Sequence, residues 1–181
     1  MLFKDIKESQ ITMTPLMLPS HSNFSGKIHG GYILNLMDQV AFACASKHSG
    51  HYCVTASVNK VDFLNSIEVG ELVILKASVN FTGQTSMMVG LRVESENIQT
   101  GVVKHCNSSY FTMVAKNKIG NNVLIPGLVL ETENSIRHFA RSVKRQEQAK
   151  IRGESFKASE FKVEEYIELI TQHNVKIKYK Y

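Results

Sequence analysis

The hydrophobic pattern of the chain predicts one long helix followed by a series of long strands. Residues 32–49 contain neither proline nor glycine, and Gly50 follows them as a helix stop. Apolar and polar residues then alternate in four later segments, loosely in the first, as expected for strands with one buried face. Their short links predict antiparallel neighbours, and a curved antiparallel sheet packed on one long helix is an α+β architecture. The four segments are residues 51–63, 71–81, 86–96 and 102–115.

The segment before the helix predicts less regular structure. Residues 1–10 are polar and are expected to form an irregular lead-in. Residues 11–18 are apolar and β-branched, and Pro15 within them predicts an edge strand because proline cannot donate a ladder hydrogen bond.

The C-terminal third of the chain is helical in character. Helix formers fill residues 131–152, Gly153 is expected to end that helix, and residues 155–173 predict a second one. The sequence therefore predicts a core domain of residues 1–126. Residues 127–181 are expected to form a helical C-terminal extension, either within the same domain or as an oligomer contact.

Composition narrows the class of protein. The 181 residues are 43% hydrophobic and 20% charged, as in soluble globular domains, and no apolar run approaches the ~20 residues that span a bilayer. The N-terminus lacks the apolar core of a signal peptide, so a cytoplasmic location is expected. The net charge of +5 suits a polyanionic small ligand as well as ordinary solubility, and is too weak to indicate nucleic acid.

The sequence gives little indication of a metal site or of a reactive thiol. The three cysteines are widely spaced and odd in number, which predicts neither a disulfide framework nor a metal cluster. The seven histidines contain no pair at metal-ligand spacing, so no metal site is expected.

The candidate chemistry lies around the start of the long helix. Gly30 and Gly31 precede it and allow a ligand to approach main-chain N–H groups. Within the helix, the spacing of Leu34, Asp38 and Ala41 places a carboxylate on an apolar face. Asp38 is then expected to be partly desolvated, and the alternative is a solvated residue at the edge of that face.

Several short motifs together resemble the signature of the hotdog-fold acyl-CoA thioesterases. The resemblance covers roughly residues 10 to 135 and rests on the order and spacing of the set. The motifs are Pro19-Ser-His-Ser-Asn23, Gly26, Ile28-His-Gly-Gly31, Leu36-Met37-Asp38-Gln39, Val54-Thr-Ala-Ser-Val58, Val61-Asp-Phe63, Val69-Gly70-Glu71 and Gly83-Gln-Thr-Ser-Met87.

This resemblance implies a fold, a reaction and three catalytic positions. The sheet is expected to wrap around the central helix, and the reaction is hydrolysis of fatty acyl-CoA to free fatty acid and coenzyme A. Asp38 is expected to act as general base or nucleophile, and Asn23 to orient water or substrate. The N–H of Gly31 at the helix N-terminus is expected to form the oxyanion hole. No cofactor is implied, since coenzyme A belongs to substrate and product.

Other matched positions are assigned less specific roles. Gly30, His29, Thr85, Ser86 and Lys60 are expected to contribute to substrate binding. Each of these residues also has a simpler interpretation. Lys60 would then be a solvated surface charge and His29 a packing residue. Thr85 and Ser86 would only hold the hairpin turn.

The resemblance also implies an assembly. The asparagine and aspartate of one site come from different subunits in this family, so a homodimer is the expected catalytic unit. Relatives often form trimers of dimers, so a hexamer is expected.

Two other functions are alternatives to hydrolysis. A hotdog hydratase needs an acidic residue paired with histidine in a hydratase motif, and the sequence shows none. A non-catalytic acyl-CoA binding or sensing protein stays open, although the presence of both Asn23 and Asp38 favours hydrolysis.

Overall fold

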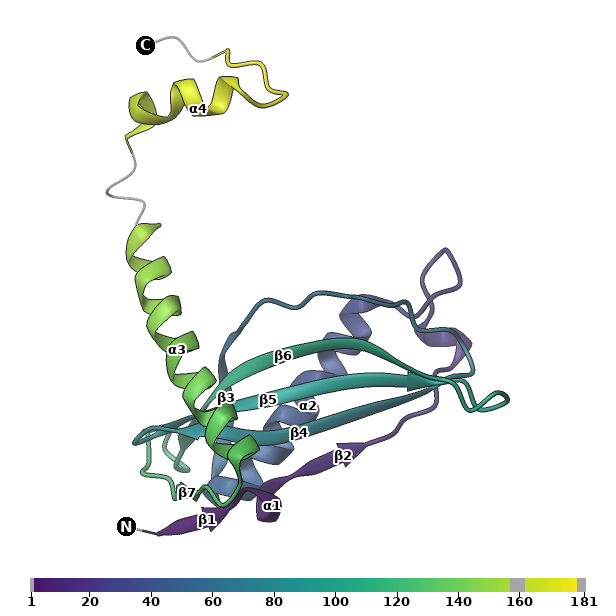
Figure 1. Cartoon of the computed structure of the whole chain (residues 1–181), viewed down its shortest axis with the longest axis vertical. Coiled ribbons are helices and arrows are strands. Elements are labelled where there is room, and N and C mark those ends of the chain that lie inside the picture. The colour runs from purple at the N-terminus through teal and green to yellow at the C-terminus, as the bar shows by residue number, and fades with distance from the viewer. Residues whose placement is uncertain (1, 157–161, 179–181) are drawn as a thin grey trace. The chain divides into compact units, whose positions relative to one another are not determined.

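Helix α2, Gly30–Ser49, packs against one face of a curved five-stranded antiparallel sheet in the computed structural model (Figure 1). The strand order is β2-β4-β5-β6-β3, so β2 and β3 form the two edges. This arrangement confirms the predicted α+β class and the wrapping of the sheet around one long helix. The strands are β2 (Ile11–Met13), β3 (Tyr52–Val58), β4 (Leu72–Thr82), β5 (Ser86–Glu96) and β6 (Val103–Lys116).

The structure describes residues 2–156 and 162–178. The chain divides into two compact units, residues 1–142 and residues 143–181. The candidate chemistry all belongs to the first unit. The division after residue 126 expected from the sequence stays a prediction.

Both ends of α2 are set by residues that favour a helix boundary. The helix begins at Gly30, two residues before the predicted start, because the His29 side chain accepts the N–H of Gly31 as an N-cap. It ends at Ser49, and the C-cap residue Gly50 has a left-handed φ of 74°, a conformation that costs glycine little.

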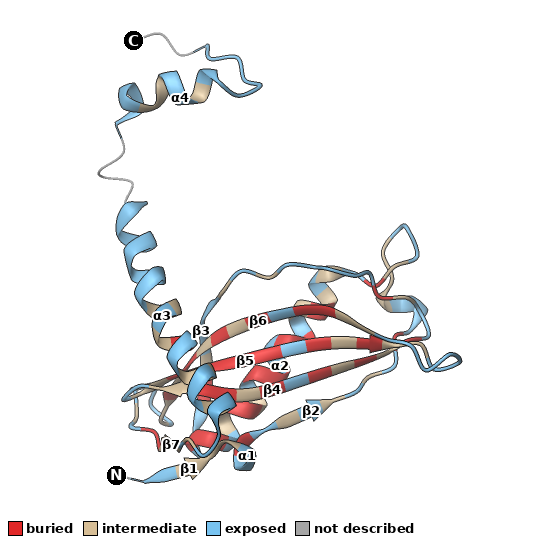
Figure 2. Cartoon of the chain, in the orientation of Figure 1, coloured by how far each residue is buried: buried red, intermediate tan, exposed pale blue. Residues whose placement is uncertain are grey.

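The core lies between α2 and the inner face of the sheet, where the buried residues cluster (Figure 2). Small side chains on the helix, Ala41, Cys44 and Ala45, are fully buried and let the strands approach closely. The facing residues of β4 recur at every second position, as the alternating pattern predicted. The β4 residues in the core are Val73, Leu75, Ala77 and Val79.

The prediction of an irregular N-terminus is wrong. Strand β1 (Phe3–Asp5) pairs in parallel with β7 (Gly127–Val129), and helix α1 (Ile6–Ser9) follows directly. Asp5 and Glu8 form a capping box at the start of α1. The Phe3 ring lies so close to Gly127 that a Cβ there would be 2.6 Å from it, so glycine is what admits the ring.

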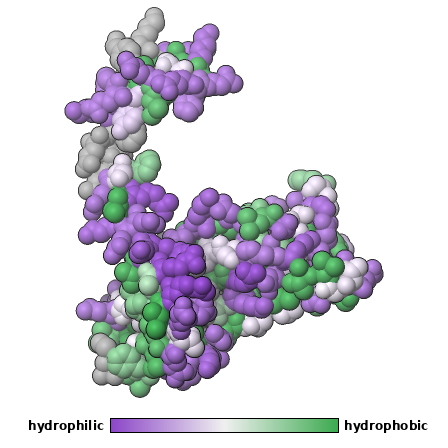
Figure 3. All heavy atoms as spheres, viewed as in Figure 1, coloured by the Kyte–Doolittle hydropathy of each residue, from purple (hydrophilic) through white to green (hydrophobic). Residues whose placement is uncertain are grey.

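The prediction that Gly153 ends the first C-terminal helix is also wrong. Helix α3 runs from Glu133 to Ser155, because an exposed glycine costs a helix only about 1 kcal/mol. Hydrophilic residues predominate along α3 (Figure 3). Within residues 162–173, the second expected helix corresponds to the 3₁₀ helix η3 (Val163–Tyr166) followed by α4 (Ile167–Thr171). Its predicted residues 157–161 lie outside the described residues.

An ion pair at the edge of the core yields a stability prediction. The Glu71 carboxylate, 7% exposed, accepts hydrogen bonds from Lys104 Nζ at 2.9 Å and from the Glu68 N–H at 3.0 Å. Burial raises the pKa of Glu71, but these bonds outweigh it and hold the pKa below its ordinary value. A carboxyl whose pKa is lowered on folding stabilises the fold above its unfolded pKa, and this contribution disappears as the pH falls through the folded pKa.

We therefore expect Glu71→Gln to lower the free energy of unfolding by about 1.5–3 kcal/mol at neutral pH. The deficit relative to wild type should shrink on acidification, as followed by urea unfolding at several pH values. Glu68→Gln is the matched control, because the Glu68 pair with Lys27 is solvent-accessible and should contribute less than about 1 kcal/mol. A deficit that is independent of pH would contradict the assigned ionisation.

Candidate active site

The loop before α2 is organised by Asn23. Its side-chain oxygen accepts hydrogen bonds from the N–H and hydroxyl of Ser25, at 2.9 and 2.8 Å, and from the N–H of Lys27 at 3.2 Å. The asparagine carbonyl oxygen is thus occupied by the loop, and its NH₂ group is the part suited to donate to a ligand.

Asn23 and Gly30 line the same surface hollow at the N-terminal end of α2. The ring of Phe63 lies over Gly30, and a Cβ at Gly30 would be only 3.2 Å from it. Gly30 therefore leaves room for the aromatic ring at the mouth of the helix. The hollow is completed by Lys27, Ile28, Ile33, Asn65, Ser66 and Ile67.

The N–H groups at this helix end are not equivalent. The N–H of Gly31, the predicted oxyanion donor, is bonded to His29 Nδ1 at 3.0 Å. Tyr32 and Ile33 donate to the carbonyl of His29 at 3.0 and 3.3 Å. Within the described residues, the N–H of Gly30 has no protein acceptor. The N–H of Gly30 is therefore free to donate to a ligand, and the N–H of Gly31 is held by the exposed imidazole of His29.

Asp38 lies on the exposed side of α2, so the expected partial desolvation is wrong for the single chain. The buried face is centred on Met37, Ala41 and Cys44, and Asp38 is one residue, or about 100°, beyond it. Its Oδ1 accepts a 2.5 Å hydrogen bond from the hydroxyl of Thr55 on β3. This bond fixes the direction of the carboxylate at the surface.

The hollow at Asp38 is separate from the hollow at Asn23. Phe42 and Tyr52 form an edge-to-face pair at its rim, with ring centroids 5.4 Å apart and exposed fractions of 38% and 62%. The rise of a helix places Gly31 about 10 Å from Asp38 along the axis. The remaining lining residues are Gln39, Cys53, Val54 and Thr55.

The other predicted binding residues fall outside both hollows. Thr85 and Ser86 form the β4–β5 hairpin, where the strand register places Ser86 opposite Val114 and Val114 opposite Val54. Ser86 is therefore two strands, about 10 Å, from the Asp38 hollow. Lys60 is exposed and pairs with Asp62 at 3.0 Å.

The sequence alone does not identify Thr55 as a candidate site residue. It lies within the Val54–Val58 motif of the resemblance, but nothing in its local pattern distinguishes it from an ordinary strand threonine. Its contact with Asp38 depends on how β3 packs beside α2.

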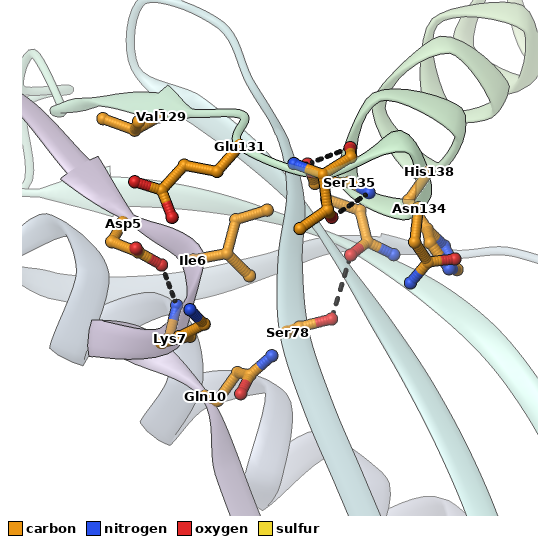
Figure 4. Close-up of a pocket in the computed structure, with 12 residues that line it drawn as sticks. Asp5, Ile6, Lys7, Gln10, Ser78, Val129, Glu131, Asn134, Ser135 and His138 are labelled. Carbon is orange, nitrogen blue, oxygen red and sulfur yellow. Dashed lines mark hydrogen bonds between the residues drawn. The ribbon is translucent and has the colours of Figure 1, made fainter.

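A different hollow lies on the outer face of the sheet, between α1 and the start of α3 (Figure 4). Most of the residues that line it carry polar side chains, among them Gln10, Ser78, Asn134, Ser135 and His138. None of the residues predicted for catalysis or binding lines it.

Two of the three cysteines, Cys44 and Cys106, are poorly suited to act as nucleophiles. Burial raises the pKa of the Cys44 thiol to about 12, and burial also raises the pKa of Cys106. Among the described residues, no group of three or more metal-ligating side chains is close enough to hold an ion. No helix in the described part of the chain is long and apolar enough to cross a membrane.

Sequence comparison places these features in a known family. Residues 25–102 match the family model of the thioesterase superfamily. Protein VdlD of Helicobacter pylori is 40% identical over 139 residues, which are 77% of this chain and 79% of that protein. The uncharacterized acyl-CoA thioester hydrolase YkhA of Bacillus subtilis is 33% identical over 146 residues, 81% of this chain and 85% of that protein.

Solved structures agree. An apo-hexameric acyl-CoA thioesterase matches 84% of this chain and 98% of its own, with a TM-score of 0.82 and 35% identity. An acyl-CoA hydrolase from Bacillus cereus matches 96% of this chain and 99% of its own, with a TM-score of 0.79 and 33% identity. Structures of the Staphylococcus aureus acyl-CoA hydrolase, 26% identical, include alanine variants of an asparagine, an aspartate and a threonine, with TM-scores of 0.75–0.80. They match 84–95% of this chain and 95–99% of their own.

The helix enclosed by its sheet and the polar residues at the helix N-terminus define a hotdog-fold enzyme. The chain belongs to the acyl-CoA thioester hydrolases of the thioesterase superfamily.

Proposed function

We propose that the protein hydrolyses fatty acyl-CoA thioesters to a fatty acid and coenzyme A. The observation that carries this proposal is the oriented carboxylate of Asp38, held by Thr55 at 2.5 Å. The Staphylococcus aureus enzyme, whose structures include complexes with coenzyme A and butyryl coenzyme A, was varied at three residues. Those residues have the same types and the same separations along the chain as Asn23, Asp38 and Thr55.

The proposed reaction needs only groups of this chain and a water molecule. The thioester oxygen accepts hydrogen bonds from the N–H groups of Gly30 and Gly31, which stabilise the charge of the tetrahedral intermediate. The NH₂ of Asn23 orients the thioester or the water. Asp38 removes a proton as water adds to the carbonyl carbon, and coenzyme A leaves as a thiolate that takes up that proton. Direct attack by Asp38, through an anhydride that water then cleaves, uses the same residues. The reaction requires no resident cofactor.

We infer that each site combines residues from two copies of the chain. A water that contacts both Asp38 and the reacting carbon must lie within about 3 Å of each, yet Asp38 and Gly31 of one chain are about 10 Å apart along the helix. A second copy supplies the missing half. Strand β3 offers an unpaired sheet edge for it, and Phe42 and Tyr52 offer an apolar contact.

The homodimer is thus the proposed catalytic unit. A trimer of dimers is proposed for the full assembly, by analogy with the hexameric thioesterases of similar structure. A cytoplasmic location stays a prediction.

The test is release of free thiol from a panel of acyl-CoA substrates, from acetyl to palmitoyl. Turnover of the longer chains supports the proposal and gives the chain-length preference. Binding of acyl-CoA without thiol release would overturn it in favour of a sensing protein.

Thr55 provides a sharper test of the carboxylate's role. Thr55→Ala removes the bond that orients Asp38, so kcat should fall by about 10-fold to 100-fold, the value of a hydrogen bond to a charged group. Thr55→Ser keeps the hydroxyl and should retain most activity. Thr12→Ala, at an exposed position of β2, is the control for threonine removal from a strand. Equal activity of Thr55→Ala and wild type would show that the bond does not serve catalysis.

A further inference from the structure

The His29 side chain is hydrogen-bonded to the N–H of Gly31, a group that the proposed reaction needs. The residue is the N-cap of α2, with extended backbone angles of −64° and 127°, and its Nδ1 accepts the N–H of Gly31 at 3.0 Å. Asparagine, aspartate, serine and threonine are the usual residues at such a position. The imidazole comes so near that a Cβ at Gly31 would be 3.1 Å from Nδ1. A larger residue at position 31 would require the imidazole to shift by a few tenths of an ångström.

The backbone around His29 is fixed, whereas its side chain is exposed. The His29 N–H donates to the carbonyl of His21 at 2.9 Å, and the His29 carbonyl accepts from Tyr32 and Ile33. The His21 ring is itself stacked on Tyr32, with centroids 4.0 Å apart, and its Nδ1 accepts the N–H of Leu18. Rotation of the His29 side chain alone can therefore uncover the Gly31 N–H without disturbing the helix.

We propose that His29 is a positioning residue that covers the oxyanion donor of Gly31 in the free enzyme and yields it to the thioester oxygen. This inference rests on the proposed function, in which that N–H stabilises the oxyanion. One N–H cannot form two strong hydrogen bonds, so substrate binding breaks the bond to Nδ1. The imidazole in effect competes with the thioester for this donor.

The inference predicts that stability and activity respond in opposite directions to His29→Phe. Phenylalanine cannot accept the N–H, so the helix loses its cap and Tm should fall by several degrees. The uncovered donor should raise kcat/KM by about 3-fold to 10-fold, the net value of one hydrogen bond. A cap with a purely structural role predicts that both quantities fall together.

The substitution His29→Asp is expected to have the opposite effects on stability and on activity. Aspartate caps a helix well, so Tm should be retained or rise. Its carboxylate holds the N–H more strongly and places a negative charge where the oxyanion forms, so kcat/KM should fall about 10-fold or more. The same substitutions at His173, an exposed histidine of the second unit, are the matched controls and should change neither quantity.

A binding measurement separates this inference from the proposed hydrolysis. The probe is an acyl-CoA analogue in which CH₂ replaces the thioester sulfur, so that the carbonyl is kept and cleavage is impossible. Calorimetry should give tighter binding to His29→Phe and weaker binding to His29→Asp than to wild type.

The possible results are distinct. Tighter binding of the analogue to His29→Phe and weaker binding to His29→Asp, in a protein that releases no thiol, would support the role of His29 and overturn the proposed hydrolysis. Thiol release by wild type, with both variants changed in the same direction in kcat/KM and in affinity, would overturn the role of His29 and leave the hydrolase standing. Unchanged affinity and kcat/KM in both variants would overturn the role as well.

Discussion

Asp38→Asn is expected to lower kcat by about 10²-fold to 10⁴-fold while the protein stays folded. The amide keeps the size of the side chain and still accepts the hydrogen bond from the Thr55 hydroxyl, but it can neither take a proton nor attack the thioester. The loss should appear in kcat more than in KM, because the group acts in the transition state. Thiol release at saturating substrate measures it.

The location of Asp38 makes this a clean experiment. Its carboxylate is exposed in the single chain, outside the core on α2, so its replacement creates no cavity and breaks no buried network. Thermal unfolding should therefore match that of wild type. Asp62→Asn removes another exposed carboxylate, one paired with Lys60, and should leave kcat unchanged. Full turnover by Asp38→Asn would exclude this residue as base and as nucleophile.

The core of the fold was predictable because its signals are local. Strand β5 has the predicted limits, and β4 and β6 start and end one residue later than predicted. Each of these central strands alternates because one face is buried against α2, and the alternation is present in the sequence itself. Helix α2 was found for the same reason, apart from its first turn, which depends on a histidine cap that local propensity does not favour.

The remaining elements depend on distant partners or on a balance of small terms. Strand β1 exists because Phe3 packs on Gly127, more than a hundred residues away, and a strand of only three residues is too short to give a periodic signal. The continuation of α3 through Gly153 reflects strong helix formers on both sides, which outweigh one glycine.

The candidate site likewise has residues that a local sequence pattern indicates and a contact that depends on tertiary packing. Motif spacing in the sequence selects Asn23 and Asp38 as candidates, whereas the contact of Thr55 with Asp38 depends on the packing of β3 beside α2. Helical spacing also placed Asp38 on the wrong side of the buried face, because apolar neighbours such as Phe42 are themselves exposed in the single chain. Exposed aromatic residues beside an exposed carboxylate are consistent with a surface that a second copy covers, which is the basis of the strongest prediction about the assembly.

Mixed dimers are expected to distinguish a shared site from a site within one chain. Asn23→Ala and Asp38→Ala should each be nearly inactive alone. A dimer that contains one chain of each variant holds one site with both residues intact and one site with neither, so it should recover about half of the wild-type kcat per dimer. A flexible linker that joins one chain of each variant into a single polypeptide fixes this pairing, also within a trimer of dimers, and the linked protein is used for the thiol assay.

The reciprocal pair reverses the expectation and controls for the effects of mixing. A dimer of wild type with the Asn23→Ala, Asp38→Ala double variant contains one defective residue in every shared site, and it should be nearly inactive. If each site instead belonged to a single chain, the dimer of wild type with the double variant would have about half of the wild-type activity. The first mixed dimer would then have none. The same four side chains are present in both mixed dimers, two intact and two replaced, so instability of the variants cannot produce the difference. Activity in the first mixed dimer alone would establish that the separate hollows at Asn23 and Asp38 are two halves of one site.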